Sequence, residues 1–212
     1  MKLYGYWRSS SAWRVRIALE WKGLPVEHVP VHLVADGGQQ HGPAHVARNP
    51  LRQVPVLELD DGRLLSQSVA IVEYLDEVHP APPLMPADPY LRAWTRQLVE
   101  VVNSGIQPLQ NLRILVALEA GGVDRMAWAR QVIDPGLRAL QDLARPRAGR
   151  FLVGDEPTLA DLYLVPPLYN ARRFGCDLAP LDLLLRVEQA AVALPAFQRA
   201  HPDRQPDAVP GG

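Results

Sequence analysis

The chain has 212 residues, and its 22 lysines and arginines nearly balance 23 aspartates and glutamates, giving a formal net charge of −1 at pH 7. A chain so close to neutrality lacks the positive excess that attracts nucleic acids or anionic membranes, so neither is an expected partner. No apolar run approaches the roughly 20 residues that span a bilayer, and the N-terminus has a strand pattern instead of a signal-peptide pattern. A single cysteine excludes an internal disulfide framework, and together these features favour a cytoplasmic protein. Its six histidines are scattered and are not accompanied by a pair of cysteines, so no metal is expected.

The first structural signal is a strand followed by a helix. Residues 3–6 alternate as a strand does, and the apolar period then changes from 2 to 3.6 over residues 13–21. Serine is a preferred helix N-cap because its oxygen accepts an N–H bond from the first turn. The free N–H groups and the dipole of a helix start also favour an anion. More polar groups lie at this junction than a cap requires, and we predict an anion site formed by Arg8, Ser9, Ser10 and Ser11.

The following elements complete a small α/β domain. Residues 26–31 predict a second strand, at an edge because it contains Pro30, and residues 41–49 predict one or two helical turns. Pro55 should open a third strand, which a turn at 60–62 joins to a fourth before a helix that ends near His79. This β-α-β-(α)-β-β-α order is that of the thioredoxin-like fold, in which the proline that opens the third strand is commonly cis.

Residues 79–86 are rich in proline, and the chain after them reads as helical. We therefore predict two domains, a thioredoxin-like domain at 1–80 and an all-helical bundle at 87–212. Within the bundle, Gly105 and Pro108 should break the first helix, and Thr158 and Asp161 form a capping box before an apolar central helix. A last helix is expected over 181–194, with the tail from Pro195 weakly structured.

The sequence offers no obvious nucleophile of its own. The three serines have no adjacent histidine or lysine, and an unassisted serine hydroxyl is a weak nucleophile. Cys176 lies far in sequence from both junctions where hydroxyls meet a helix start, and an inert thiol is the better interpretation. Either the protein is not an enzyme, or its nucleophile comes from a bound molecule.

The chain resembles the zeta class of glutathione transferases. The main motif is Arg-Ser-Ser-Ser-Ala-Trp-Arg-Val-Arg-Ile-Ala-Leu at 8–19, which is close to the class pattern S-S-C-x-W-R-V-R-I-A-L. Ser11 stands where the class usually has cysteine, a change expected to affect the rate more than the main reaction. Further segments that resemble the family follow in order at 36–40, 53–55, 67–68, 106–112 and 158–161.

The resemblance implies a cytoplasmic homodimer with the glutathione transferase fold and with glutathione as coenzyme. The implied reaction is the cis–trans isomerisation of maleylacetoacetate to fumarylacetoacetate, with maleylpyruvate as the alternative substrate. The glutathione sulfur would add to the double bond, allow its rotation, and leave. Two other functions remain open. One is a binding module without catalysis, and the other is general detoxifying conjugation, which would need an apolar acceptor site that the implied arginines do not suit.

The resemblance also implies roles for individual residues. Ser10 would hydrogen-bond the glutathione sulfur, with Ser9 and Ser11 beside it, and a nearby hydroxyl and helix start would lower the thiol pKa. The Val54 backbone would pair with the cysteinyl amide. The remaining glutathione contacts are assigned to Gln40, Gln67, Ser68, Gln107 and Asn111.

The substrate carries two carboxylates, which arginine binds with a two-pronged fork. By resemblance, the substrate-binding arginines are Arg8, Arg172 and Arg173, and Arg173 is preferred over Arg172. The implied catalytic residues are Arg8, Ser9, Ser10 and Arg173. Gln107 and Asn111 are four residues apart and are expected on one helix face. By spacing alone, these two are better interpreted as a polar helix surface.

Overall fold

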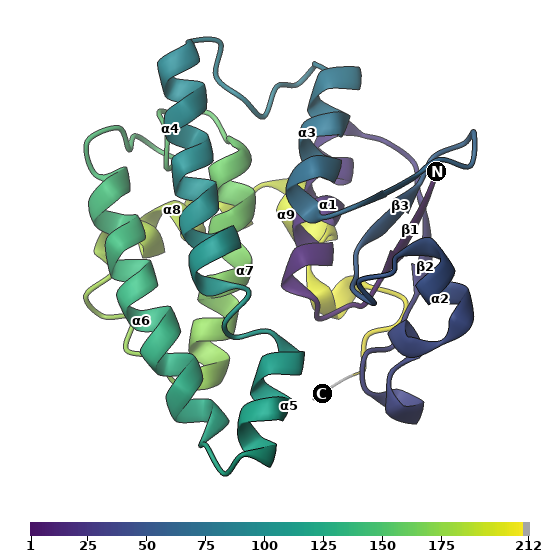
Figure 1. Ribbon diagram of the computed structural model, residues 1–212. Helices are drawn as coiled ribbons and strands as arrows, with labels where there is room; N and C mark the ends of the chain where they lie inside the picture. Colours follow the sequence, from purple (N-terminus) through teal and green to yellow (C-terminus); the bar gives the residue numbers. More distant parts are fainter. Residues whose placement is uncertain (210–212) are drawn as a thin grey trace. The chain divides into compact units, whose positions relative to one another are not determined.

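The computed structural model describes residues 1–209, and its contacts divide the chain into two compact units (Figure 1). The first unit contains residues 1–82 together with the chain from residue 194 on, and the second contains residues 83–193. The break between them lies inside the proline-rich segment. The division differs from the predicted one, in which 87–212 forms the second domain, because the end of the chain returns to the first unit.

The sheet of the first unit has four strands in the order β2-β1-β3-β4. These are β1 (Lys2–Gly5), β2 (Glu27–Pro30), β3 (Val56–Glu58) and β4 (Leu64–Ser66). β2 is parallel to β1, whereas β3 is antiparallel to both of its neighbours. The prediction that Pro30 lies in an edge strand is confirmed, since β2 has a neighbour on one side only. The β-strand order and the helices confirm the thioredoxin-like α/β class.

Helices cover both faces of this sheet. α1 (Ser10–Lys22) and α3 (Ser68–Val78) pack against each other on one face (Figure 1). Gly5 lets α1 approach β1 closely, because a Cβ at this position would lie 3.3 Å from the Ala12 Cβ. α2 (Pro43–Arg48) lies against the opposite face, where the Arg48 guanidinium carbon is 4.3 Å from the centre of the Tyr4 ring. Between β2 and α2 the chain makes two short 3₁₀ turns, η1 (Ala35–Gly37) and η2 (Gln39–His41).

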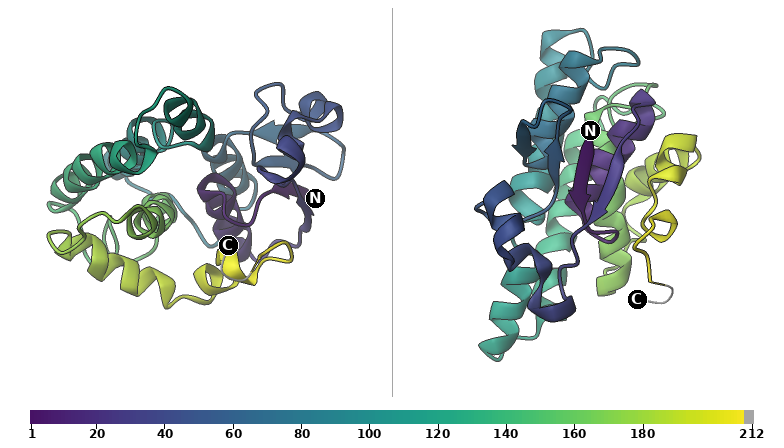
Figure 2. Two further views of the ribbon diagram at one scale, coloured as in Figure 1. Left: turned by 90° about the horizontal axis from the view of Figure 1, so that it is seen from below. Right: turned by 90° about the vertical axis from the view of Figure 1, so that its right-hand side faces the viewer.

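The end of the chain is ordered against α1, so the prediction of a weakly structured tail is wrong. It forms α9 (Pro195–Arg199) and a 3₁₀ turn, η4 (Pro202–Arg204), and Figure 2 shows it in yellow beside the purple α1. Phe197 is only 2% exposed, and Ala196 and Ala200 are also buried. The burial of these apolar groups gives the tail a packed position that its short, proline-punctuated sequence does not suggest.

The second unit is helical, as predicted. Its elements are α4 (Pro89–Glu100), the π-helical segment η3 (Val101–Ile106), α5 (Leu112–Ala120), α6 (Arg125–Ala144), α7 (Leu159–Phe174) and α8 (Asp182–Val192). α7 is buried along most of its length and packs against α4, α6 and α8. The predicted capping box is present, because the Asp161 carboxylate accepts from the Thr158 N–H and the Thr158 side chain accepts from the Asp161 N–H. The expected interruption near Gly105 and Pro108 is confirmed by the π-helical segment and the turn that follows it.

Candidate functional site

The topology of the first unit brings several chain ends to one edge of the sheet. β1 and β4 run in the same direction, so their carboxyl ends and the helix starts after them meet at this edge. β3 runs the opposite way, so its amino end, preceded by Val54 and Pro55, lies there too. β2 is parallel to β1, and its carboxyl end leads into the loop that contains Gln40. All predicted glutathione contacts of the first unit therefore belong to segments that meet at this edge.

The serine loop, residues 6–9, joins β1 to α1. The Ser9 N–H donates to the Tyr6 carbonyl across 2.9 Å, which closes a tight turn before the helix. Ser9 is the N-cap, and its Oγ accepts from the Ala12 N–H at 3.3 Å, so the hydroxyl hydrogen remains available to donate. Ser10 is the first helical residue and is 6% exposed, whereas Ser11 is half-buried. The predicted strand-to-helix junction is therefore present, and Ser9 is the serine that caps the helix.

A second helix start lies after β4. Ser68 is the first residue of α3 and is buried, and its Oγ accepts from Nη1 of the fully buried Arg14 at 3.4 Å. This bond ties the start of α3 to the body of α1. Gln67 has a φ of 72°, a region that residues other than glycine rarely occupy and that costs about 1–3 kcal/mol. Such strain occurs where the backbone has to present particular groups, which fits the predicted role of Gln67 and Ser68.

The Val54–Pro55 peptide bond is cis, as predicted. The turn before it is anchored by α2, because the Gln53 carbonyl accepts from Asn49 Nδ2 at 2.9 Å and from His45 Nε2 at 3.0 Å. A carbonyl only accepts, so His45 carries its hydrogen on Nε2. His45 and Asn49 are 4% and 2% exposed. The sequence gives no periodic signal that would reveal them as supports of Val54, because α2 is short and poorly patterned.

Gln40 lies in η2 and is 8% exposed. Its Nε2 donates to the Leu33 carbonyl at 3.2 Å, whereas its Oε1 is buried without a hydrogen-bond partner. A buried acceptor without a partner costs about 1–3 kcal/mol, so this amide is suited to a donor supplied by a ligand.

The structure contradicts the prediction that Gln107 and Asn111 share one helix face. Gln107 follows the π-helical segment, and a turn separates it from Asn111, which is the N-cap of α5 and accepts from the Arg113 N–H at 3.4 Å. The polar contacts run through Gln110 instead, which donates to Gln107 Oε1 and accepts from Asn170 Nδ2, each at 3.2 Å. Gln110 and Asn170 are buried and were missed, because their pairing joins residues 60 positions apart.

The two adjacent arginines at the end of α7 have different surroundings. Arg172 forms a two-pronged pair with Glu188 of α8, with Nη1 2.6 Å from Oε1, and this contact raises the Arg172 pKa. The Arg173 guanidinium carbon lies 5.5 Å from the Phe174 ring centre. In the first unit, the Arg8 guanidinium carbon lies 5.1 Å from the Trp7 ring centre. The fork of Arg172 is thus committed to a carboxylate of the protein itself.

Cys176 does not have the surroundings of a reactive thiol. Burial, together with a hydrogen bond to Asp134, raises the pKa of its thiol to about 12. A thiol with such a pKa is almost entirely protonated at neutral pH, and only the thiolate is a good nucleophile. Among residues 1–209, no group of three or more His, Cys, Asp or Glu side chains could hold a metal ion. No helix in that range is long and apolar enough to cross a membrane.

Known proteins resemble the chain over nearly its full length. Residues 3–83 match the glutathione S-transferase N-terminal domain, and residues 117–203 match the glutathione S-transferase C-terminal domain. Maleylacetoacetate isomerase of Rattus norvegicus is 47% identical over 205 residues, which cover 97% of this chain and 94% of the relative.

Solved structures give the same result. Maleylacetoacetate isomerase of Anaeromyxobacter dehalogenans, with glutathione bound in its active site, is 56% identical with a TM-score of 0.89, and the match covers 98% of this chain and 97% of that one. A bacterial maleyl pyruvate isomerase of the zeta class is 43% identical with a TM-score of 0.94, and covers 99% of this chain and all of that one. The chain therefore belongs to the glutathione S-transferase family, and within it to the zeta class.

Proposed function

We propose that the protein is a glutathione-dependent isomerase that converts maleylacetoacetate to fumarylacetoacetate. The observation that carries the proposal is the meeting of two serine-bearing helix starts and the Val54–Pro55 turn at one edge of the sheet, in a chain 47% identical to a maleylacetoacetate isomerase. Ser9 and Ser10 are retained there, whereas a binding module without catalysis has no need of hydroxyls beside a sulfur.

The residues at this edge fit glutathione group by group. The N–H groups at the start of α3, with the Ser68 hydroxyl, suit the γ-glutamyl carboxylate, since a helix start is an anion site. Gln67 would hold the rest of that group, and the Val54 backbone the cysteinyl amide. The unpartnered Oε1 of Gln40 is an acceptor for a donor at the glycyl end. Gln107 and Asn111 remain proposed contacts from the second unit.

When bound, glutathione supplies a thiolate that adds reversibly to the cis double bond and so permits its rotation. The role of the protein is to keep that sulfur deprotonated. The Ser9 hydroxyl can donate to a sulfur while its oxygen stays bonded to the Ala12 N–H, and the start of α1 adds a positive potential. Ser10 remains the residue proposed to donate to the sulfur, and Ser11 extends the same polar surface.

The arginines are proposed to interact with the negative charges of the substrate. Arg8 precedes the capping serine directly and is proposed to stabilise negative charge that develops on the substrate. Arg173 is proposed to bind a substrate carboxylate, with Arg172 held aside by Glu188. An apolar acceptor site for general conjugation would not require these cations.

A second candidate substrate is maleylpyruvate, favoured by the TM-score of 0.94 to a maleyl pyruvate isomerase. A side-by-side assay of both substrates, with and without glutathione, tests the proposal. We expect glutathione-dependent turnover that is faster with maleylacetoacetate. Faster turnover of maleylpyruvate would reverse the substrate assignment, and retention on glutathione resin without turnover of either substrate would identify a binding module. Efficient conjugation of aromatic halides in place of isomerisation would identify a detoxifying transferase.

We also propose a homodimer that works in the cytoplasm. Leu51, Leu64 and Val78 of the first unit are 58%, 39% and 52% exposed, and a second copy would cover apolar surface of this kind. Sedimentation equilibrium should give twice the monomer mass of 23.5 kDa, and a monomer across the working concentration range would refute the dimer.

A further inference from the structure

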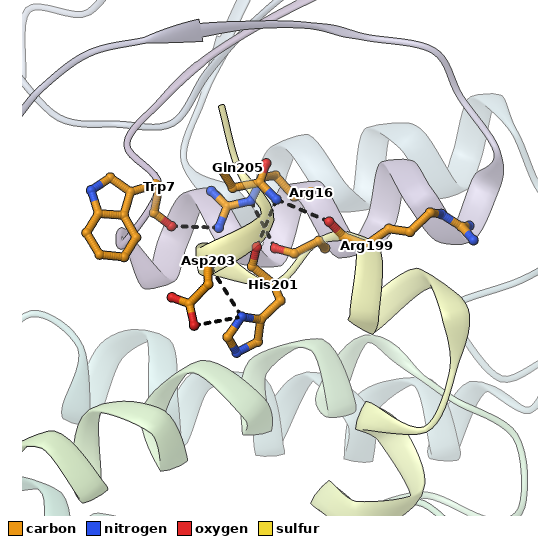
Figure 3. Close-up of polar contacts among 7 residues, drawn as sticks. Trp7, Arg16, Arg199, His201, Asp203 and Gln205 are labelled. Atoms are coloured by element: carbon orange, nitrogen blue, oxygen red, sulfur yellow. Dashed lines mark hydrogen bonds and ion pairs between the residues drawn. The ribbon is translucent and has the colours of Figure 1, made fainter. Parts of the chain in front are cut away.

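The feature that the proposed mechanism leaves unexplained is the return of the chain end to α1. We call residues 194–209 the C-terminal strap (Figure 3). Its apolar residues pack against α1, and Arg199 Nε lies 2.5 Å from Glu20 Oε2. Within the strap, the Gln205 side-chain amide donates to the Arg199 and His201 carbonyls at 3.2 and 2.9 Å. The strap is therefore a folded segment with its own polar contacts.

Arg16 of α1 joins the strap to the serine loop. Its guanidinium donates through Nε to the Ala200 carbonyl at 3.2 Å and through Nη2 to the Trp7 carbonyl at 2.8 Å (Figure 3). Through Nη1 it also donates to the Tyr6 carbonyl at 3.4 Å. Arg16 is 3% exposed, and burial lowers its pKa to about 9. A buried cation costs several kcal/mol unless other groups compensate for the lost water. Here two of the three acceptors belong to the serine loop and one to the strap.

The peptide groups of Trp7 are held from both sides by charged side chains. Its N–H donates to Asp207 Oδ2 of the strap at 2.9 Å, and its carbonyl accepts from Arg16. The charge of Asp207 also acts on Arg16, whose pKa it raises against the effect of burial. Trp7 lies two residues before the N-cap Ser9, whose N–H is bonded to the Tyr6 carbonyl. The position of Ser9 thus depends on a backbone segment that the strap and Arg16 hold.

We infer that the C-terminal strap holds the serine loop in its working geometry, with Asp207 as a positioning residue that acts on the catalytic serines through the Trp7 N–H. The inference rests on the proposed function, because it is the sulfur of bound glutathione that the serines serve. The strap is far from the serines in sequence, and Asp207 is not among the residues proposed to contact glutathione or substrate. Its loss should therefore raise the thiol pKa and leave the affinity for protonated glutathione nearly unchanged.

Three substitutions at Asp207 separate positioning from charge compensation. Asp207→Ala removes both the acceptor and the charge, Asp207→Asn keeps an acceptor oxygen without the charge, and Asp207→Glu keeps the charge but displaces the oxygen. Asp203→Ala is the matched control, because Asp203 lies in the same strap, is 69% exposed in its side chain, and contacts His201 instead. Each full-length variant is first checked for folding by circular dichroism.

Two readouts are followed in all variants. Hydrogen exchange at the Trp7 amide should be fastest in Asp207→Ala, intermediate in Asp207→Glu, and near wild type in Asp207→Asn and Asp203→Ala. The pKa of the bound glutathione thiol, taken from thiolate absorbance against pH, should rise in the same order. At a pH low enough to keep the bound thiol protonated, kcat should fall roughly tenfold for each unit of that rise with the glutathione Kd unchanged, and the kcat deficit should close near pH 9.

If the charge of Asp207 only compensates Arg16, Asp207→Glu should behave as wild type and Asp207→Asn should be as impaired as Asp207→Ala. That result would overturn the inference. An unchanged Trp7 exchange rate in Asp207→Ala would do so as well. Should Asp207→Ala not fold, the comparison of Asn with Glu decides alone. If the wild-type protein itself does not lower the thiol pKa, the proposed function fails, while Trp7 exchange still decides whether the strap holds the loop.

Discussion

The Asn49 side-chain amide and the Gln53 carbonyl form a 2.9 Å hydrogen bond that anchors the turn before the cis Val54–Pro55 bond. Asn49→Ala removes this donor and should weaken glutathione binding roughly threefold to tenfold, because the Val54 backbone becomes less well ordered. Isothermal titration with glutathione measures the change. Arg48→Ala is the control on the same helix, since its guanidinium bonds the Ala44 carbonyl instead, and equal losses in both variants would contradict the role given to Asn49.

The two proposed catalytic serines can be distinguished by substitution. Ser9→Ala should cost about 1 kcal/mol of stability because it removes the N-cap of α1, whereas Ser10→Ala should not carry that cost. Both should raise the pKa of the bound thiol and lower kcat at neutral pH, and the larger effect identifies the main donor to sulfur. Thermal unfolding and a pH–rate profile provide the two measurements. Ser11→Cys restores the usual residue of the class and should alter the rate only modestly; unchanged profiles in both alanine variants would refute the serine mechanism.

Arg172 and Arg173 should respond differently to removal. Arg172→Ala leaves Glu188, whose side chain is 11% exposed, without its partner and should lower stability by about 1 kcal/mol. Arg173→Ala should raise KM for the substrate with little effect on glutathione affinity. Urea unfolding and steady-state kinetics on the same two variants test this contrast. A loss confined to glutathione affinity in Arg173→Ala would show that its assignment to the substrate is wrong.

Asp161 should be a main support of α7. Its carboxylate accepts from the Leu152 N–H, the Thr158 N–H and the Thr158 hydroxyl at 2.9, 2.7 and 3.0 Å, and it is fully buried. Asp161→Asn turns one acceptor into a donor that faces another donor, so we expect a loss of about 2–4 kcal/mol in urea unfolding. Asp155→Asn is a surface control. A loss no greater than that of the control would contradict this role.

The same carboxyl should make this loss depend on pH. Burial raises the pKa of Asp161 to about 6, above the value of 3.8 for an exposed aspartate. The folded chain therefore binds more protons than the unfolded chain between these values, and its stability falls as pH rises through this window. Asparagine does not titrate, so the advantage of the wild type over Asp161→Asn should be larger at about pH 4 than at about pH 7.

Cys176 should react slowly with iodoacetamide in the folded protein. Since its pKa is raised to about 12, the alkylation rate should climb with pH through about pH 10 without reaching a plateau. The chain has one cysteine, so the modified mass reports this thiol alone. In denaturant the rate should level off above the ordinary thiol pKa of about 8.5. A plateau below pH 9 in the folded protein would mean that the thiol is more accessible than its contacts indicate.

Local patterns were sufficient to predict the elements that frame the candidate site. The serines mark the start of α1, and the Thr158–Asp161 box starts α7, because each signal lies within a few residues of its effect. Pro30 indicated an edge strand for an equally local reason, since proline lacks an N–H for a second neighbour.

The failures involve contacts between distant residues. The π-helical segment that begins at Val101 could not be predicted from residue spacing. Its last residue, Ile106, packs against Gly136, where an added Cβ would lie 2.5 Å from an Ile106 carbon. The packing of the tail depends on Arg16 and Ala200, which are 184 positions apart. Lys22 makes contacts of the same kind, since its side chain is buried and donates to Asp76 and to two backbone carbonyls.

Because a ribosome releases the chain from its N-terminus, the strap is synthesised long after the serine loop that it contacts. Residues 1–82 emerge early and hold all the strands and the proposed glutathione contacts of their unit, yet the acceptors that Ala200 and Asp207 provide emerge more than a hundred residues later. A nascent chain can thus form the sheet while its serine turn is still loosely held. On the inferred role of the strap, the growing polypeptide activates the coenzyme only after its helical unit has been made.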